Sequence, residues 1–465
     1  MAKTDYSNPF AAGQPATISS PNAGKVRWII CFLLFYVTTV NYIDRGVIGM
    51  VEPKLAKLFT WTQADYGNII VVFQIAYALG LLLAGRFIDW IGVRWGFAIA
   101  VAIWSLAEMS HGLLIYLPVN STWAHAAWIV QLGGLSILGF GVARFVLGFA
   151  ESANFPACIR AVAEWFPKRQ RALATGLLNC GANIGAIATP VLFTYILPAL
   201  KLNWSAGFYA TGLLEFAWIA VWIFFYRSPR NHSMVSPAEL AFIESEPDPP
   251  AQKVSWAELL RHRQTWAFVV VKFMTDPIWW FWLFWIPDFL HSQYKLNITS
   301  FGPAVIVIYS MTTVGSIFGG WLSGFFMRRG MTVNKARKLT MLAMACCVPP
   351  VILVEFIPGQ KYLWLVVFLI GLAASAHQGF SANIFTVASD VVPRFAVGTL
   401  VGLGGMAGAI GGIILAWLVG HILTWTHNNY TIPFVIAGSS YLVAMGIMQL
   451  IMPRLVPITL KTANP

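Results

Sequence analysis

Charged side chains occur inside strongly apolar stretches of this chain. The segment NYIDRG at 41–46 places Asp44 beside Arg45, about 100° apart around a helix. An ionised side chain near the centre of a membrane costs roughly 2.5 to 3.5 kcal/mol on insertion scales, so such residues usually serve a function. A guanidinium binds a carboxylate through two hydrogen bonds, and a neighbouring acid can exchange a proton. The pair favours anion binding coupled to protons; the alternative is that the two side chains merely pair with each other or with loops.

A second acid and a second cation share one face of a later apolar segment. The stretch ARFVLGFAES contains Arg144 and Glu151 seven residues apart, which places both on one side of a helix. We expect Glu151 to be a second proton carrier, with Arg144 stabilising its ionised form in one state and releasing it in another. A static ion pair is the alternative.

A cation, an acid and several tryptophans meet in KFMTDPIWWFWLFW at 272–285. Lys272 is a candidate second anchor for substrate charge, and Trp279 or Trp280 is a candidate for stacking on the apolar face of a sugar ring. Because proline lacks an amide hydrogen, we expect Pro277 to break the helix, as helices often do at membrane binding sites.

Uncharged polar residues in other apolar segments supply donors and acceptors suited to hydroxyl groups. The stretch AHQGFSANIF contributes His377, Gln378, Ser381 and Asn383, although polar residues also hold membrane helices together, and for Ser381 we weigh packing equally. Further candidates are Tyr42, the pair Gln74 and Tyr77, and the pair Asn179 and Asn183. Three glutamates also fall within apolar segments, and we assign them no role: Glu108, Glu215 and Glu355.

The elements that carry these residues are long apolar helices. Hydrophobic residues make up 58% of the 465 residues and charged residues 10%, whereas soluble globular proteins average about 45 to 50% and about 25%. The segments lack the alternation of barrel strands and approach the roughly 20 residues that span a bilayer. We predict an all-α polytopic membrane protein with twelve spans: 26–50, 66–88, 95–117, 133–163, 171–197, 205–226, 265–290, 301–327, 337–357, 362–389, 395–422 and 430–452.

Basic residues segregate relative to these spans. Of the 30, only Lys54, Lys57, Lys201, Lys295 and Lys361 fall on one side, and Arg45, Arg144 and Lys272 lie within the membrane. The positive-inside rule therefore predicts an inner-membrane protein with both termini cytoplasmic, and the net charge of +12 needs no nucleic-acid partner.

A polar stretch, 227–262, is predicted to be a cytoplasmic linker between two six-helix bundles, 25–226 and 263–453. Residues 1–24 are predicted to be a disordered N-terminus and 454–465 a cytoplasmic tail.

Several motifs resemble known transporter families. GRFIDWIGVRWG at 85–96 is similar to the G-x-x-x-D-x-x-G-x-R loop of the major facilitator superfamily, matched by Gly85, Asp89, Gly92 and Arg94. NYIDR, ARFVLGFAESANFPA and EWFPKRQRALATG resemble the anion:cation symporter family. LRHRQTWAF, KFMTDPIWWFWLFWIPDFL and AHQGFSANIFTVASDVVP resemble bacterial hexuronate transporters.

The resemblance implies an alternating-access importer of a hexuronate such as galacturonate or glucuronate. It matches Asp44 and Glu151 to the family's proton-coupling acids and Arg45 to its substrate-carboxylate ligand. Vesicular relatives carry an arginine in the seventh membrane span. In this chain the cation nearest to that position is Lys272. Protons would be the coupling ion, with no other cofactor and no metal, and the partners would be the carboxylated sugar and the lipid bilayer, with the protein a monomer.

Other functions remain open at this stage. One is a facilitator-type transporter of another organic anion, such as an aldonate or an aromatic or dicarboxylic acid, or a proton-coupled exporter. A membrane-integral enzyme using Asp44, Glu151 or His377, or a transporter-shaped sensor, ranks lower because no catalytic motif or folded signalling domain is recognisable.

Overall fold

The structure is a computed structural model that describes residues 24–61, 63–114, 116, 134–245, 255–295, 302–427 and 429–459. Every regular element among these residues is helical, so the expected all-α fold is confirmed. The expected N-terminal segment lies outside the described residues apart from Gly24, as do 246–254 of the expected linker and 460–465 of the expected tail.

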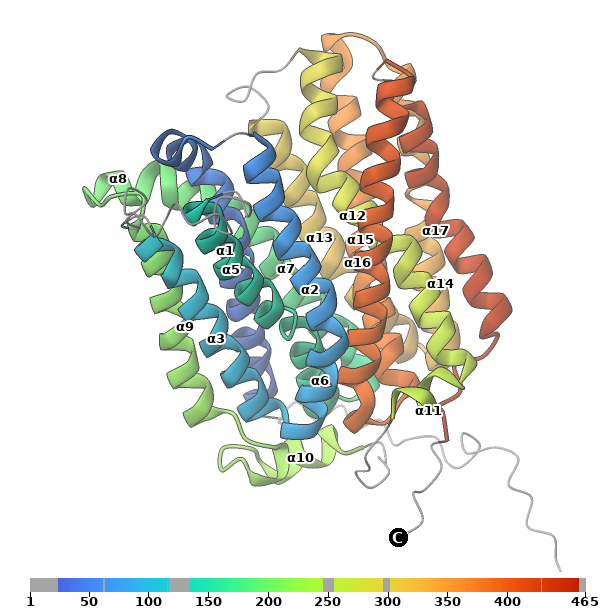
Figure 1. The fold of residues 1–465 in the computed structure, drawn as a ribbon. Coiled ribbons are helices and arrows are strands. Elements are labelled where there is room, and N and C mark those ends of the chain that lie inside the picture. The colour runs from blue at the N-terminus through green and yellow to red at the C-terminus, as the bar shows by residue number, and fades with distance from the viewer. Residues whose placement is uncertain are drawn as a thin grey trace, which may run out of the picture.

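The first half of the chain forms one group of helices (Figure 1). These are α1 (Val26–Phe59), α2 (Gln63–Ile91), α3 (Val93–Leu114), α5 (Leu135–Glu151), α6 (Asn154–Trp165), α7 (Lys168–Val191), α8 (Leu197–Ala199) and α9 (Ala206–Phe225), with a π-helical turn at Leu192–Ile196 joining α7 to α8. Two short helices, α10 (Pro237–Ile243) and α11 (Trp256–Leu260), follow within the expected linker.

The second half forms the other group. It contains α12 (Arg263–Tyr294), α13 (Gly302–Arg328), α14 (Val333–Cys346), α15 (Leu363–Val391), α16 (Val397–Trp425) and α17 (Thr431–Ile451), with 3-10 turns at Pro349–Phe356, Gln360–Tyr362 and Arg394–Ala396. The precise limits proposed for the linker and for the two bundles stay a prediction.

The surface of these groups is apolar enough to face lipid. Eleven spans among the described residues are long and apolar enough to cross a membrane. The expected span 265–290 lies within α12. This helix carries Lys272 and Asp276 and is not one of the eleven spans. Large apolar side chains point outward, such as Leu450 at 82% and Phe224 at 80% exposure. Backbone polar groups inside a bilayer must be bonded within the protein, which explains why the spans are helices.

One expectation about helix breaks is wrong. α12 continues through Pro277 without interruption, so no broken helix forms there. The span expected at 133–163 is confirmed as one membrane-length span, Leu135–Trp165, within which a two-residue turn separates α5, ending at Glu151, from α6, beginning at Asn154. Pro156 in the first turn of α6 lacks the amide hydrogen that a continuous helix would use, consistent with a break just before it. Glu151 therefore ends a helix.

The two halves meet at the end of the molecule where α10 and α11 lie, which we call the linker face (Figure 1). The carboxylate of Asp89, at the end of α2, accepts hydrogen bonds from the backbone amides of Gly398 (3.2 Å) and Thr399 (2.6 Å) and from the Thr399 hydroxyl (2.7 Å). Gly398 and Thr399 lie in the first turn of α16, whose amides have no partner within the helix. The acid of one half thus caps a helix of the other.

A second set of contacts joins α7 to α13, α14 and α15. Arg171 Nη1 donates to the Ser389 carbonyl at 2.7 Å, and Arg337 Nη2 donates to the Lys168 carbonyl at 2.5 Å. Further along α7, Cys180 Sγ lies 3.5 Å from the Thr313 carbonyl of α13 and 3.1 Å from the Gly176 carbonyl of its own helix. A Cβ at Gly320 would collide with the Ala172 carbonyl, so this close crossing requires a glycine. The linker face is therefore closed.

Candidate functional site

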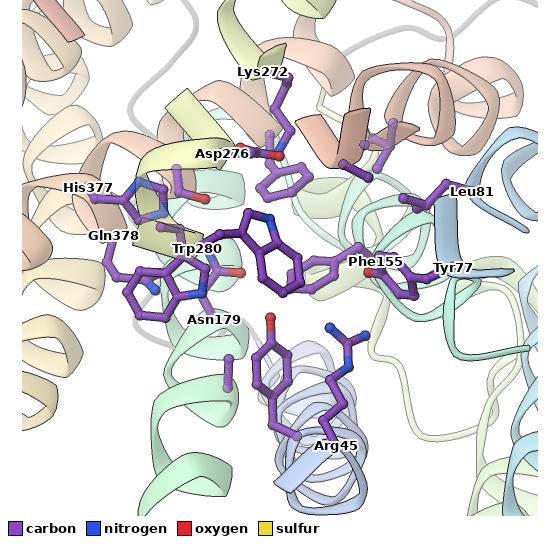
Figure 2. Close-up of a pocket in the computed structure, with 18 residues that line it drawn as sticks. Arg45, Tyr77, Leu81, Phe155, Asn179, Lys272, Asp276, Trp280, His377 and Gln378 are labelled. Atoms are coloured by element: carbon purple, nitrogen blue, oxygen red, sulfur yellow. The ribbon is translucent and has the colours of Figure 1, made fainter. Parts of the chain in front are cut away.

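A cavity of about 90 Å³ lies between the two halves (Figure 2). α1, α2, α6 and α7 of the first half and α12, α15 and α16 of the second contribute its walls. The structure brings nine of the predicted substrate-binding residues together here: Tyr42, Arg45, Tyr77, Asn179, Lys272, Trp280, His377, Gln378 and Ser381. Residues from distant parts of the sequence thus share one polar chamber.

Arg45 extends into this cavity from α1. Its Nε donates to Glu151 Oε2 at 2.7 Å, and the Glu151 side chain is fully buried while that of Arg45 is 14% exposed. The guanidinium lies over the rings of Tyr42 and Tyr77, at 4.7 and 4.5 Å from their centroids. These rings hold the cation in place through cation–π attraction. The guanidinium therefore has a buried carboxylate on one side and an open cavity on the other.

The ion pair differs from the expected one. Arg144 was expected to hold Glu151 ionised, whereas the salt bridge of Glu151 is with Arg45. Asp44 does not form a salt bridge with Arg45 either; it is fully buried on α1, outside the cavity lining. Arg144 is likewise buried, at 1% exposure, and acts electrostatically on Asp44 and Glu151. Both lie behind Arg45, inside the first half.

A second ion pair forms the opposite wall of the cavity. Lys272 Nζ lies 2.6 Å from Asp276 Oδ2, one turn further along α12, and 3.8 Å from the centroid of the Phe385 ring. Figure 2 shows this pair across the cavity from Arg45, with Trp280 between them. Asp276 was absent from the predicted site, although its spacing of four residues from Lys272 on one helix could have indicated the pair.

His377 is held by aromatic neighbours. Its ring stacks on that of Trp279 at 5.2 Å, and its Nδ1 is hydrogen bonded to the Tyr441 hydroxyl. That hydroxyl also lies 3.3 Å from the Thr275 carbonyl. The Tyr441 hydroxyl has one proton, so it can donate to His377 Nδ1 or to the Thr275 carbonyl but not to both at once. Tyr441 was missed by the sequence reasoning because nothing near it in sequence marks it as polar machinery.

Other predicted residues lie outside the cavity. Gln74 lines an adjoining apolar hollow with Trp285 and Gly412. Asn383 donates to the Gly319 carbonyl at 2.8 Å and so holds α15 to α13, which is a packing role in place of the expected substrate contact. Asn183 is fully buried without a hydrogen-bond partner in the described part of the chain.

The three glutamates without an assigned role separate into two groups. Glu355 accepts a hydrogen bond from the Tyr430 amide at 3.2 Å, just before α17 begins, and so caps that helix. Glu108 and Glu215 are fully buried near Asp44 in the first half.

Comparison with known proteins places the chain among membrane transporters. The sequence model described as Major Facilitator Superfamily matches residues 34–416. A hexuronate transporter of Escherichia coli (strain K12) is 28% identical over 405 residues, which cover 85% of this chain and 87% of that protein. A galacturonate transporter of Dickeya chrysanthemi is 28% identical over 308 residues, covering 65% and 83% respectively.

Solved structures share the fold at low sequence identity. The major facilitator transporter FucP in its outward conformation superposes with a TM-score of 0.65 at 14% identity, covering 92% of this chain and 99% of that one. The proton:xylose symporter XylE, bound to a sugar analogue, gives a TM-score of 0.64 at 13% identity, covering 94% and 98%. The chain is accordingly a multi-pass membrane protein with two six-helix halves, and its relatives are transporters of small molecules.

Proposed function

Since the chain belongs to the Major Facilitator Superfamily, we propose that this non-enzymatic transporter imports a sugar acid, such as galacturonate or glucuronate, together with protons. Transport takes place across the inner membrane by alternating access. The linker face is cytoplasmic, because most basic residues fall on that side of the expected spans. With that face closed, the site would receive substrate from the outer side.

One observation carries the proposal: Arg45 lies between a buried carboxyl and the cavity. The guanidinium is bonded to Glu151 and also lines the cavity, so Glu151 and a substrate carboxylate compete for the same cation. When Glu151 takes up a proton it loses its charge and releases Arg45 for the substrate. Binding of the substrate carboxylate in turn favours the protonated form of Glu151. This reciprocity is the thermodynamic requirement for coupled transport.

The remaining lining suits a carboxylated sugar. Trp280 offers a flat apolar surface in the middle of the cavity, as sugar rings require, and Asn179, Gln378 and Ser381 supply hydroxyl partners. Lys272 adds positive charge on the far wall, offset by Asp276. The relatives named for hexuronate and galacturonate support this choice of substrate.

Uptake of labelled galacturonate into proteoliposomes under an imposed pH gradient tests the proposal. We expect accumulation with the wild-type protein and none with Arg45→Ala, because the substrate carboxylate would lose its charge-assisted bonds. Arg230→Ala removes an arginine that is 76% exposed and serves as the matched control, with uptake unchanged. If Arg45→Ala binds galacturonate with wild-type affinity, Arg45 is not the carboxylate ligand.

Proton coupling has a separate test. We expect Asp44→Asn to exchange substrate across the membrane but to lose accumulation driven by the pH gradient. Glu244→Gln, in the exposed pair with Arg230, should keep both activities. Accumulation by Asp44→Asn against its gradient would refute a coupling role for Asp44, and movement of substrate and protons in opposite directions would indicate an exporter.

A further inference from the structure

Behind the cavity, the first half contains a group of ionisable side chains that reaches the cavity only through Arg45. It brings together residues of α1, α3, α5 and α9, and we call it the buried carboxyl cluster: Asp44, Arg45, Glu108, His111, Arg144, Glu151 and Glu215. Its four carboxyl groups are all fully buried. Of its members only Arg45 lines the cavity.

The charges of this cluster do not balance if every carboxyl is ionised. Four carboxylates would face two guanidiniums, those of Arg45 and Arg144. The other titratable groups facing them among the described residues are uncharged when neutral: His111 of α3, Tyr36 and Tyr42 of α1 and Tyr77 of α2. An uncompensated buried charge is strongly unfavourable, so a group in such a place becomes neutral instead. Neutrality of the cluster requires two protons beyond the ordinary ionisation of its members.

Unsatisfied atoms show where these protons are needed. Among the described residues, both carboxyl oxygens of Glu108 and both of Asp44 are buried without a hydrogen bond of ordinary geometry, as are Nε and Nη2 of Arg144. The carboxyl groups of Asp44 and Glu215 are nevertheless direct neighbours. Two carboxylates cannot bond to each other, because each only accepts; a proton on one of them turns the contact into a hydrogen bond.

The surroundings of Glu215 point the same way. The Trp104 indole donates to Glu215 Oε1, and the Ser105 hydroxyl lies 2.8 Å from Glu215 Oε2 and 2.7 Å from the Val101 carbonyl. The single hydroxyl proton of Ser105 cannot serve both oxygens. If it is donated to the carbonyl, which can only accept, the contact with Glu215 is a hydrogen bond only when Glu215 carries a proton.

We propose that Glu108 and Glu215 are proton-binding residues, and that the buried carboxyl cluster holds two protons in this conformation. The role of these protons in transport rests on the proposed function. A proton can pass from Glu215 to Asp44 when the O–H bond of one carboxyl breaks as that of the other forms, so Glu215 keeps a proton next to the coupling acid. Glu108 neutralises the second excess charge beside Arg144.

Infrared spectroscopy of the purified protein at neutral pH tests the proposal without substrate or gradient. A protonated carboxyl has a carbonyl stretch separated from that of a carboxylate and from amide bands. We expect such absorption in the wild type, with loss of one component in Glu215→Gln and of another in Glu108→Gln. Glu244→Gln is the control and should leave it unchanged, since the Glu244 carboxylate is paired with the exposed guanidinium of Arg230.

Two results would overturn the proposal. The first is a wild-type spectrum without protonated carboxyl absorption, a measurement that needs no variant to fold. The second is a folded Glu215→Gln or Glu108→Gln protein whose absorption equals that of the wild type. Failure of galacturonate uptake would contradict the proposed function and leave these spectra unaffected, so the two ideas can fail separately.

Discussion

Asp89 at the linker face offers a direct measure of how strongly the closed state is held. Its carboxylate receives three hydrogen bonds from Gly398 and Thr399 at the positive end of α16, and its side chain is 8% exposed. Arg160 Nη1 lies 3.7 Å away on the same side. Because all three bonds cross from one half to the other, they exist only while this face is closed.

Asp89→Asn keeps the shape and removes the charge. Hydrogen bonds to a charged acceptor are about twice as strong as neutral ones, and an anion at a helix N-terminus contributes roughly 0.3 to 1 kcal/mol. A hydrogen bond to a charged group contributes about 1.5 to 3 kcal/mol, so we estimate that Asp89→Asn lowers the free energy favouring the closed linker face by about 2 kcal/mol. Each 1.4 kcal/mol is about tenfold in an equilibrium constant, so the open fraction at the linker face should rise roughly 30-fold.

Cys180 is a native reporter of this opening. Its thiol is 3% exposed and lies against the Thr313 carbonyl of the other half, so a thiol reagent reaches it only when α7 and α13 separate. We would replace the other cysteines, Cys31, Cys158, Cys346 and Cys347, by alanine and measure the labelling rate of Cys180 in detergent. The rate should increase roughly 30-fold in Asp89→Asn and stay unchanged in Glu244→Gln. An unchanged rate in Asp89→Asn would refute the view that this cap holds the face closed.

Three further predictions concern single sites. Arg45→Lys should weaken galacturonate binding about tenfold or more, measured by calorimetry, because an ammonium cannot present a planar fork of donors. Lys272→Met should lower the melting temperature because Asp276, whose side chain is 20% exposed at the cavity wall, loses its counter-ion, and Asp276→Leu in the same protein should recover most of the loss. Burial lowers the pKa of His232 below 6.5, so the linker favours neutral His232 and loses stability as pH falls through 6.5; proteolysis should accelerate in acid, but not in His232→Gln.

The helices and their order could be predicted from the sequence because each depends on local composition. A long apolar run must become a helix in a bilayer, whatever lies beside it. The error at Pro277, and the turn inside the span Leu135–Trp165 that composition does not reveal, show the limit of local reasoning. A proline inside a long membrane helix can be accommodated when neighbouring helices satisfy the freed backbone group, and Pro277 lies against Gly411 of α16.

The residues of the cavity could be predicted better than their partners. A charged or amide side chain in an apolar segment is conspicuous in sequence, and most such residues of the expected substrate site do line one cavity. Which acid pairs with which base depends on how helices rotate and cross, and sequence spacing does not encode this. Arg144 and Glu151 share a helix face, yet Glu151 pairs with Arg45 from α1. The break after Glu151 ends α5 at this residue, so its side chain is not constrained to follow the straight stripe that seven-residue spacing implies.

The same reasoning explains why Glu108 and Glu215 had no interpretation until the helices were placed. A single buried glutamate in a membrane span has many uses, and its sequence neighbours do not distinguish them. The charge count becomes informative only when α1, α3, α5 and α9 bring four carboxyl groups against two guanidiniums. Proton binding is then a property of the assembled group, because removing charge from any one carboxyl changes the proton affinity of the others. Coupling in this protein would thus depend on residues that the substrate never touches.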